Sequence, residues 1–343
     1  MHRYILILFS SVLFSQDYPI LGSSGMLDII SWNVEQYPKH SQTNYHLTSI
    51  INEINVDVIA FQEITSTASF NSLVSSLDGD WMGYRSGGNS NYGELAYAIN
   101  LQGINIISVY DILSEDEYYF GYRPPYVLEF TLEEQAYVII NNHFKCCGDD
   151  ILDLDNSWDE EYRRLIASQL LESYIEENYS LEKVIILGDL NDSISDGELH
   201  NVFWGFIESD YFQFADYDIA FGPSNDWSYP SWPSHLDHFI ITEPLFSAFN
   251  IENVETFKVD NYFPGGWNAY DSRVSDHRPM FLSLDLISQI QGDLNGDQSV
   301  DILDVVSILN LILEGEYDII GDMNLDSTMN VMDVVILVNS ILN

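Results

Sequence analysis

Basic residues are scarce in this chain of 343 residues. It contains 11 Lys and Arg against 54 Asp and Glu, which gives a formal net charge of -43 at pH 7. Such a charge keeps a protein soluble and repels polyanions at low ionic strength. We interpret most of these carboxylates as a solvated acidic surface suited to salty surroundings, and a minority as cation sites. The sequence also lacks the basic stripe that follows a nucleic-acid backbone in proteins that bind one.

Cysteine is nearly absent. The only two cysteines are the neighbours Cys146 and Cys147, which cannot form a disulfide bond between distant parts of the chain. Stability is therefore expected to come from packing. The sequence leaves two states of the pair open, a strained ring and two thiols.

Long apolar runs are missing too. Residues 4–14 follow a short basic start and form an apolar run that is too short to span a bilayer comfortably. This pattern predicts a signal peptide over residues 1–15, with cleavage after Ser15, and hence a secreted protein without stable membrane insertion. A core strand or a retained anchor is the alternative.

The remaining composition favours a folded protein of two domains. Hydrophobic residues make up 46% of the chain and aromatic residues 14%, enough for a substantial core. We expect a large domain over residues 27–287 and a small one over residues 292–343. Several strand patterns follow one another without a helix between them, which favours a mixed sheet. The predicted strands are Leu27–Trp32, Val56–Gln62, Leu95–Asn100, Ile104–Ile112, Tyr126–Thr131, Ala136–Asn142, Val184–Leu187, His238–Thr242 and Met280–Leu284, and the predicted helices are about Asn44–Ile54, Asp159–Glu177 and Asp196–Ile207.

Polar motifs stand at the ends of these strands, in the segments 31–36, 61–64, 141–145, 188–192, 236–239 and 275–279. Phosphoester hydrolysis needs a cation, a base for water, an acid for the leaving oxygen and donors for the phosphoryl oxygens. Glu63 is a hard oxygen ligand suited to Mg²⁺. His143 and His277 titrate near neutral pH. Each motif alone has an ordinary structural interpretation, such as a hydrogen-bonded histidine at a strand end or a turn at 188–191.

The order of the motifs is more specific than any one of them. Trp-Asn, Gln-Glu, Asn-His, Gly-Asp-x-Asn, Leu-Asp-His and Ser-Asp-His-Arg-Pro follow one another as in the endonuclease/exonuclease/phosphatase superfamily, which the chain resembles from about Leu27 to Leu286. The resemblance implies an α/β fold, a four-layer sandwich of two packed mixed sheets with outer helices. It places the active site at the strand ends.

The resemblance also implies roles for individual residues. Asn33 and Glu63 would lie at the catalytic Mg²⁺, or Mn²⁺ in its place, and Asp276 would join them or hold a second cation. Asp189 and Asn191 would orient the nucleophile and grip the phosphoryl group.

The acid and the base follow from the same resemblance. His277, held by Asp237, would be the general base. The secreted deoxyribonuclease branch pairs a histidine with a glutamate as general acid, and here His143 and Glu94 are the candidates. Arg123, in an Arg-Pro-Pro motif of that branch, would grip a phosphate in bidentate fashion. The segment 146–148 departs from the branch, with Cys-Cys-Gly after His-x-Lys.

A repeat with an offset of 29 residues fills the C-terminal region, which contains no Lys or Arg beyond residue 291. Both copies place oxygen ligands at the spacing of a Ca²⁺ loop and continue into an apolar helix pattern. This region resembles a type I dockerin and is predicted to be a small all-α calcium-binding domain. The expected ligands are Asp293, Asn295, Asp297, Asp301 and Asp304 in the first copy, and Asp322, Asn324, Asp326, Asn330 and Asp333 in the second.

The repeat departs from the dockerin pattern at position six, where Gln298 and Ser327 replace glycine. Positions ten and eleven, polar in many dockerins that bind cohesins, are apolar at 302–303 and 331–332. Two interpretations remain open, a module that binds a cohesin-like partner and a calcium-stapled end cap.

The leading hypothesis for function is a secreted, metal-dependent phosphodiesterase that acts as a DNA or RNA endonuclease. The acidity of the chain favours a second hypothesis, a phosphatase or phospholipid phosphodiesterase on the same scaffold. A third is an inactive binding scaffold. The combination of candidate catalytic residues argues against the third, because such a scaffold has no reason to retain them all.

Overall fold

The computed structural model describes residues 18–88, 93–286, 291–295 and 299–342. The predicted signal peptide, at 1–15, lies outside these residues. Within them, no helix has both the length and the apolar character needed to cross a bilayer. The chain divides into one compact unit that ends at Leu284 and a second that begins at Asp285.

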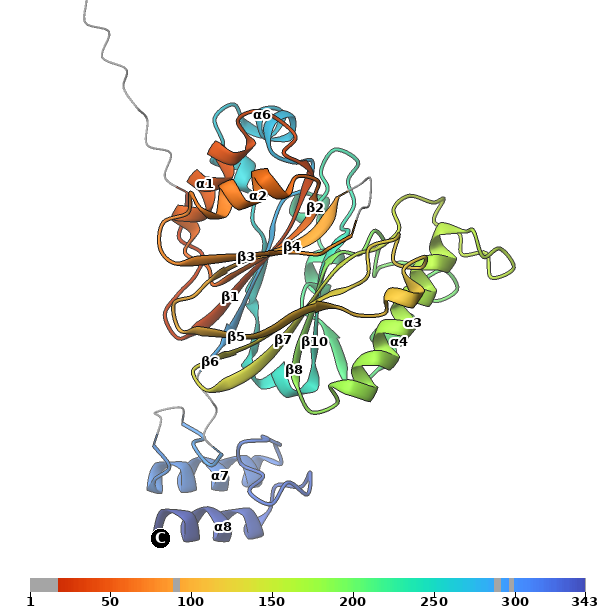
Figure 1. The fold of residues 1–343 in the computed structure, drawn as a ribbon. Coiled ribbons are helices and arrows are strands. Elements are labelled where there is room, and N and C mark those ends of the chain that lie inside the picture. Colours follow the sequence, from red (N-terminus) through yellow and green to blue (C-terminus); the bar gives the residue numbers. More distant parts are fainter. Residues whose placement is uncertain (1–17, 89–92, 287–290, 296–298, 343) are drawn as a thin grey trace, which may run out of the picture. The chain divides into compact units, whose positions relative to one another are not determined.

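Two sheets form the first unit, each with six strands among the described residues (Figure 1). Each sheet is mixed, since β1 pairs with β2 and β7 with β8 in parallel, whereas β2–β4 and β8–β10 are antiparallel. The first sheet has the order β11 (Phe249–Thr256), β12 (Met280–Asp285), β1 (Met26–Tyr37), β2 (Val58–Ile64), β4 (Glu94–Asn100) and β3 (Trp81–Arg85). The second has the order β5 (Ile104–Asp111), β6 (Tyr126–Leu132), β7 (Gln135–His143), β8 (Lys183–Asp189), β10 (Asp237–Thr242) and β9 (Phe212–Phe214).

Helices cover the outer face of each sheet. Leu47 of α1 and Tyr270 of α6 pack with Trp32 of β1 in one buried cluster, and Leu171 of α3 packs with Val138 of β7 in another. Two packed mixed sheets with helices outside are therefore confirmed. The helices are α1 (Thr43–Ile54), α2 (Thr67–Val74), α3 (Glu160–Asn178), α4 (Trp204–Glu208), α5 (Tyr217–Ala220) and α6 (Gly266–Arg273), with short 3₁₀ turns η1 (Ser114–Asp116), η2 (Ser224–Asp226), η3 (Glu243–Ala248) and η4 (Val259–Asn261).

The alternation of strand side chains decides what lies between the sheets. Val138 and Ile140 of β7 pack under α3, so the odd-numbered neighbours Asn141 and His143 face the other way, toward the first sheet. Asn141 is fully buried there and accepts a hydrogen bond from Gln62 Nε2 of β2, 2.8 Å away. Its amide nitrogen donates to the carbonyls of Phe61 and Ala96, at 3.0 and 3.2 Å. A polar bridge thus joins the two sheets near the ends that carry the motifs.

The predicted strands are all present, most of them longer by one or more residues at an end. The helix predicted over Asp196–Ile207 is wrong, because only α4, from Trp204 to Glu208, is helical. Asn201 explains the difference, since its amide donates to the carbonyls of Ile194 and Asp196 and holds this stretch as turns.

Other elements had no sequence prediction. Strand β11 alternates poorly because Asn and Glu stand at exposed positions along it. Helix α2 is only 8 residues long, and its clearest signal is Ser66, whose hydroxyl caps the helix by accepting from the Ser69 amide. Strand β3 and helix α6 were missed as well.

The second unit contains α7 (Ile302–Glu314) and α8 (Val331–Leu342), which pack through Val305, Ile308 and Leu337. Asp301 and Asp304 form a capping box at the start of α7. Gly315 ends that helix with a left-handed backbone, at φ 75°.

Removing the bridge between the sheets is expected to destabilise the first unit. Asn141→Ala deletes three buried hydrogen bonds and leaves Gln62 without its partner, so the free energy of unfolding should fall by about 2–4 kcal/mol. Urea unfolding followed by tryptophan fluorescence measures this change. The exposed Asn178 at the end of α3 provides the matched control, and Asn178→Ala should stay within about 0.5 kcal/mol of the parent chain. Equal losses in both variants would contradict the bridge.

Candidate active site

Strand register brings the motifs together at one edge of the two sheets. His143 of β7 lies directly beside Asp189 of β8, and Asp189 lies directly beside Asp237 of β10. In the first sheet, Asn33 of β1 stands beside Gln62 of β2. Because β1, β2, β7 and β8 all end at this edge, residues from distant parts of the sequence share one site.

Asn33 connects the two halves of the site. Its amide nitrogen donates to Glu63 Oε1 at 3.1 Å in the first sheet and to Asp189 Oδ2 at 2.8 Å in the second. The backbone amide of Gln36 donates to the other oxygen of Glu63, at 2.8 Å. Glu63 itself adopts a left-handed backbone, at φ 65°, where β2 bends. The structure thus places three predicted residues in contact, with the nitrogen of Asn33, rather than its oxygen, toward the carboxylates.

Asp237 and His277 form a buried pair. His277 Nδ1 lies 2.7 Å from Asp237 Oδ2, and its other nitrogen, Nε2, lies 3.7 Å from Asp189 Oδ2. Burial alone would lower the pKa of His277, but the charges of Asp237 and Asp189 outweigh it and raise that pKa to about 10. The ring is therefore held, oriented and protonated between two carboxylates.

His143 approaches the same oxygen from the other side. Its Nε2 lies 3.5 Å from Asp189 Oδ2, while its buried Nδ1 has no hydrogen-bond partner in the part of the chain that the structure describes. Burial, followed by the positive charges of Arg123 and His277, lowers the pKa of His143 well below its usual range. Glu94 is fully buried at the start of β4, and no hydrogen bond joins it to His143 within the described residues. Their pairing stays a prediction.

Arg123 and Asn191 hold the backbone of this region. Arg123 is 5% exposed, and it donates to the carbonyls of His143 and Phe144 at 3.2 and 3.0 Å. Asn191 has a left-handed backbone, at φ 55°, and also donates to the Phe144 carbonyl, at 3.2 Å. Both residues therefore fix the segment that follows His143, and a phosphate contact by Arg123 stays a prediction.

Asp276 stands beside a carboxylate that had no sequence prediction, that of Glu35. The Asp276 backbone amide donates to Glu35 Oε2 at 3.0 Å, and Lys39 forms an ion pair with the same carboxylate. Burial raises the pKa of Glu35, with Lys39 opposing the effect and Asp276 adding to it. Its position two residues after Asn33, in the motif 31–36, was the available signal.

The donor set suits a hard divalent cation. Glu63 and Asp189 converge on Asn33, and Asp237 Oδ1 is buried without a hydrogen-bond partner. Burial raises the pKa of Asp189 to about 7, and the nearby charges of Asp237 and Glu63 add to the shift. Crowded carboxylates of this kind gain most from a cation, and oxygen is the ligand that Mg²⁺ prefers. Asp189, Asp237 and His277 also place one ligand atom each within 4.8 Å of one another.

The model of the Endonuclease/Exonuclease/phosphatase family matches residues 30–277, which include every site residue described above. The chain belongs to this family. It is accordingly a hydrolase of phosphoester bonds, in a family whose members use divalent metals. No curated protein matches the sequence.

Solved structures with the same fold include D. rerio TDP2 and human Nocturnin. A D. rerio TDP2 with 14 humanizing mutations is 16% identical, with 76% of this chain and 99% of that chain covered and a TM-score of 0.56. D. rerio TDP2 complexed with a single-strand DNA product is 15% identical, with 75% and 98% covered and a TM-score of 0.55. The human Nocturnin catalytic domain with bound sulfate is 14% identical, with 76% and 93% covered and a TM-score of 0.52. At these identities the likeness shows the fold alone.

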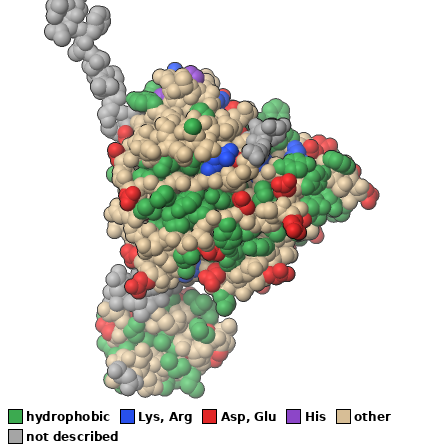
Figure 2. All heavy atoms as spheres, in the orientation of Figure 1, with side chains coloured by type: hydrophobic (Ala, Val, Ile, Leu, Met, Phe, Trp, Pro, Cys, Tyr) green, Lys and Arg blue, Asp and Glu red, His purple; other side chains and the backbone are tan. Residues whose placement is uncertain are grey.

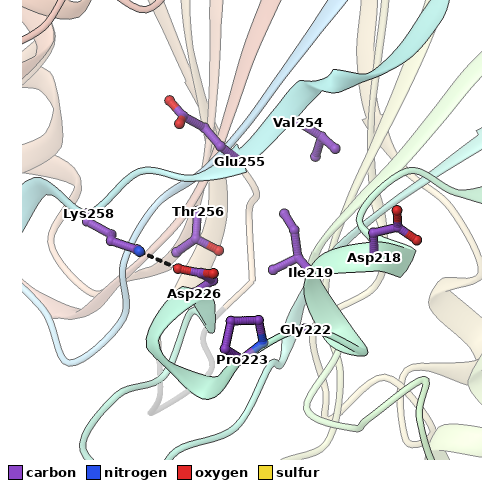
Figure 3. Close-up of a pocket in the computed structure, with 9 residues that line it drawn as sticks. All are labelled: Asp218, Ile219, Gly222, Pro223, Asp226, Val254, Glu255, Thr256 and Lys258. Atoms are coloured by element: carbon purple, nitrogen blue, oxygen red, sulfur yellow. Dashed lines mark hydrogen bonds and ion pairs between the residues drawn. The ribbon is translucent and has the colours of Figure 1, made fainter.

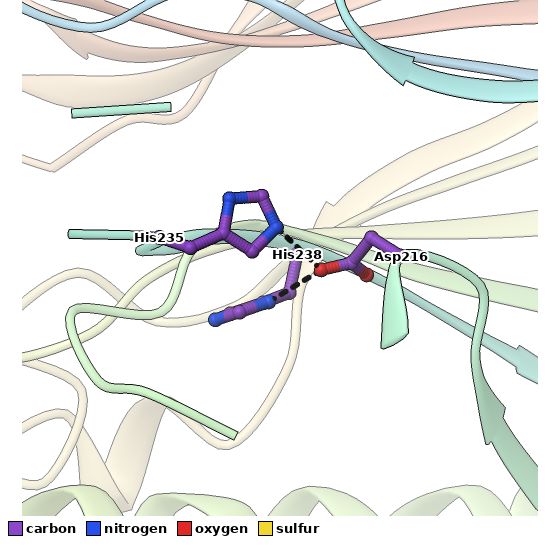
Figure 4. A group of neighbouring side chains, drawn as sticks. All are labelled: Asp216, His235 and His238. Carbon is purple, nitrogen blue, oxygen red and sulfur yellow. Dashed lines mark hydrogen bonds and ion pairs between the residues drawn. The ribbon is translucent and has the colours of Figure 1, made fainter. Parts of the chain in front are cut away.

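Asp216, His235 and His238 form a second histidine cluster (Figure 4). One oxygen of Asp216 lies 2.8 Å from His235 Nε2 and 2.7 Å from His238 Nδ1. His238 Nε2 lies 2.9 Å from the carbonyl of Asp192, so both nitrogens of this ring face acceptors and both carry protons. Although burial opposes a charged ring, Asp216 raises the pKa of His238. This buried ion pair anchors the turn after Asp189, and its distances are those of charge-assisted hydrogen bonds.

The Leu-Asp-His motif predicted Asp237 and left His238 without a role. His238 follows Asp237 on β10, so its side chain points to the opposite face of the sheet, under the helices. Asp216, at the start of α5, carried no sequence signal.

A surface pocket of about 320 Å³ lies apart from the predicted residues (Figure 3). Lys258 and Asp226 form an ion pair at its wall, and Ile219 and Val254 give it apolar lining. None of the predicted catalytic or metal-binding residues lines this pocket.

The Asp237–His277 pair generates a prediction about pH. A general base acts only as the neutral ring, so the rate should rise with pH through the pKa of His277, which Asp237 raises. Asp237→Asn removes that charge, and the midpoint of the rising limb should therefore move to lower pH. The maximal rate should fall by about 10²–10⁴-fold because the ring loses its anchor.

The measurement is kcat/KM against pH at saturating Mg²⁺ for both proteins. The exposed Asp218 is the matched control, and Asp218→Asn should leave the profile unchanged. A midpoint that stays in place, or moves to higher pH, in Asp237→Asn would rule out His277 as the base.

Proposed function

We propose that this protein is a secreted, metal-dependent phosphodiesterase that hydrolyses nucleic-acid phosphodiesters by in-line attack of water. The observation that carries the proposal is the approach of two histidines to Asp189 Oδ2, with His143 at 3.5 Å and His277 at 3.7 Å. Their opposite electrostatic settings suit a pair in which one ring takes a proton and the other gives one.

In this mechanism the chain's own residues position the water and move its protons. His277, fixed by Asp237, takes the proton of the attacking water, and Asp189 with Asn191 orients that water against the phosphorus. His143 protonates the leaving oxygen. The negative charge of a bound phosphodiester favours the protonated form of His143, which burial and the charges of Arg123 and His277 disfavour. Glu63, Asp276 and Asn33 are the proposed ligands of Mg²⁺ or Mn²⁺, which would supply charge neutralisation for the phosphoryl oxygens. Asn33 would bind the ion through its side-chain oxygen, which requires a turn of the amide whose nitrogen now donates to Glu63 and Asp189.

An exposed aromatic patch next to Arg123 supports a nucleic-acid substrate. Tyr122 is 54% exposed and Trp158 is 76% exposed, and both pack edge-on against Tyr118, with ring centroids 6.0 Å apart in each case. The guanidinium of Arg163 lies 4.2 Å from the centre of the Tyr118 ring. A pocket of about 430 Å³ begins at Tyr122 and Pro124. Aromatic faces bind unstacked bases without regard to sequence.

The argument for the second candidate, a phospholipid phosphodiesterase, is that few Lys and Arg side chains are available to bind the phosphates of a nucleic acid. Lys39, Lys258 and Arg278 are paired with carboxylates, and Arg123 donates to carbonyls. On the face drawn in Figure 2, Lys and Arg form no stripe, and carboxylates are scattered among apolar groups.

A nucleic acid would therefore bind to this protein by stacking on the aromatic patch rather than through charge. Single strands would be favoured because their bases are free. The D. rerio TDP2 complex contains a single-strand DNA product, which agrees with this class of substrate.

A substrate panel tests the proposal. The purified protein is incubated with plasmid DNA, single-stranded DNA, RNA, phosphatidylcholine vesicles and p-nitrophenyl phosphate, with Mg²⁺ or with a chelator. Cleavage of single strands that needs Mg²⁺ is expected, and His143→Ala should lower kcat by about 10²–10⁴-fold because it removes the acid. The exposed His40 provides a matched control, and His40→Ala should retain full activity.

The panel also separates the two candidates. Tyr122→Ala should raise KM for a single strand by about 5-fold or more, with little change in kcat, because one base loses its stacking partner. Hydrolysis of vesicles alone would replace the nuclease by the lipid enzyme. Activity on no substrate at any salt concentration would refute the enzymatic proposal.

Secretion belongs to the same proposal, on the strength of the signal-peptide pattern at 1–15. The mature N-terminus of protein recovered from culture medium tests it. A retained Met1 would contradict it.

We further propose that the second unit is a dockerin-like module that binds Ca²⁺ through its repeated loops. Asp304, Asp322 and Asp333 are fully buried, although this unit contains no Lys or Arg to neutralise them. Asp333 Oδ1 is buried without a hydrogen-bond partner, while Asp333 Oδ2 accepts from the Asn330 amide. A divalent cation would satisfy these oxygens. Of the proposed ligands, Asp297 lies outside the described residues.

A cohesin-like protein is the partner proposed for this module. The residues at positions ten and eleven of both loops are exposed at the start of the two helices, by 65% and 56% at Ile302 and Leu303 and by 65% and 57% at Val331 and Met332. Two matching apolar pairs suit a surface that docks on a partner. An end cap that binds Ca²⁺ but no partner would not require exposed apolar residues at these positions.

Calcium removal provides the test. The unfolding temperature of the second unit should rise with Ca²⁺ and fall with a chelator. At a hundred times the dissociation constant, each site should add about 2.7 kcal/mol to the free energy of unfolding. Asp333→Ala should abolish one of two binding events in calorimetric titration of the full chain. The exposed Glu316 is the matched control, and Glu316→Gln should retain both. Absence of heat at millimolar Ca²⁺ would exclude the calcium module.

A further inference from the structure

The two cysteines stand directly after the catalytic histidine strand. Cys146 Sγ accepts a hydrogen bond from the Cys147 thiol, and the two sulfur atoms are 2.9 Å apart. Cys147 is exposed and Cys146 is half-buried. The thiols therefore face one another on one side of the chain, within reach of a dissolved oxidant.

The backbone on both sides of the pair is fixed. Arg164 is almost completely buried in α3, and its Nη1 donates to the carbonyls of Lys145 at 2.8 Å and Cys147 at 2.6 Å. Arg164 is itself held by Asp192, at 2.7 Å, and Glu161, at 3.2 Å. Cys147 adopts a left-handed backbone, at φ 72°, which turns its side chain toward that of Cys146. The segment is thus clamped in the conformation that brings the thiols together.

We propose that Cys146 and Cys147 are a reversible modification site, which closes to a vicinal disulfide on contact with a small-molecule disulfide. Adjacent Cα atoms are about 3.8 Å apart across a trans peptide, less than the 4.4–6.8 Å or so of ordinary disulfides. Such a ring is strained and easily reduced, which is the property of a labile rather than a structural disulfide. The pair therefore does not serve to hold the fold together.

The reaction balances without any group from elsewhere in the protein. The Cys146 thiolate attacks the small disulfide, and one small thiol leaves with its electron pair and takes up the proton released from Cys146. Cys147 then loses its proton to the second leaving thiolate and attacks the Cys146 sulfur. Two electrons pass from the pair to the oxidant, which becomes two thiols.

The surroundings assign the order of the two attacks. The Lys145 ammonium lies 3.8 Å from Cys146 Sγ and provides a counter-ion for a thiolate there. Burial and the neighbouring Cys146 sulfur raise the pKa of the Cys147 thiol to about 11. Cys146 is thus the first nucleophile and Cys147 the resolving thiol.

The chain holds no other cysteine, so mass spectrometry of the full protein reads the site directly. Protein reduced with dithiothreitol is treated with oxidised glutathione, quenched with N-ethylmaleimide and weighed intact. We expect a monomer lighter by two hydrogen atoms that takes up no maleimide. After a second dithiothreitol step it should take up two.

Single variants provide the control for the resolving step. In Cys147→Ser the reaction should stop at a stable glutathione adduct on Cys146, because the second thiol is missing. In Cys146→Ser the adduct should form more slowly, since burial raises the pKa of the remaining Cys147 thiol. A parent chain that keeps both thiols reactive to maleimide, retains glutathione, or links to a second chain would overturn the proposal. These readouts do not depend on which substrate the enzyme cleaves.

The ring lies in the segment that carries His143, so its closure should reach the active site. The carbonyls of His143 and Phe144, three and two residues before Cys146, accept hydrogen bonds from Arg123, and the Phe144 carbonyl also accepts one from Asn191. Oxidised and reduced parent protein should therefore differ in kcat by about 3- to 10-fold, and the double variant Cys146→Ser, Cys147→Ser should not respond to the oxidant. Equal rates in the two states would refute this coupling while the mass readout decides the ring itself.

Discussion

The arrangement of this enzyme depends on hydrogen bonds that cross between its two sheets at one edge. Asn33 in the first sheet donates to Asp189 in the second, and one layer below, Gln62 donates to Asn141. Tyr97 adds a third link, because its hydroxyl donates to the carbonyls of Tyr126 and Ile139. Away from this edge the sheets meet through apolar side chains, which fix distance but no register. The polar links fix the register, and with it the relative positions of the candidate catalytic residues.

This register places two histidines in opposite electrostatic settings around one carboxylate. Asp237 and Asp189 raise the pKa of His277, whereas burial, followed by the charges of Arg123 and His277, lowers the pKa of His143. Asp189, between them, has its own pKa raised by burial, so its charge responds to whatever enters the site. A cation next to Asp189 would lower the proton affinity of His277, and a phosphate would raise that of His143. Substrate and metal together would therefore exchange the two protonation states, which is what acid and base catalysis requires.

Much of the fold and most of the site could be predicted from the sequence, for a physical reason. Buried strands such as β7 and β8 are continuous apolar runs that end in polar residues, and parallel strands must end together at one edge. The sequence did not correctly predict elements that depend on side-chain contacts rather than on the local pattern of apolar residues. The stretch 196–203 has a helical pattern, but the Asn201 side chain captures the backbone carbonyls that a helix would need. Asp216 became visible only through a partner more than 20 residues away, His238. Glu35 stands in the motif 31–36, but its contact with Asp276 could not be deduced from that position. The side-chain orientations of Arg123 and Asn33 could not be deduced from residue order.

The orientation of Arg123 affects how the site can bind a phosphodiester. Its Nε and Nη2 atoms donate to the carbonyls of His143 and Phe144, and several other basic side chains of the first unit pair with carboxylates of their own. Glu63, Asp189, Asp237 and Asp276 carry up to four negative charges, which exceed the two positive charges of this arginine and the protonated His277. A phosphodiester could not approach such a site on protein charges alone, because the repulsion between buried or half-buried groups is only weakly screened by salt. The dependence on a divalent cation thus begins at substrate binding, before any bond is broken.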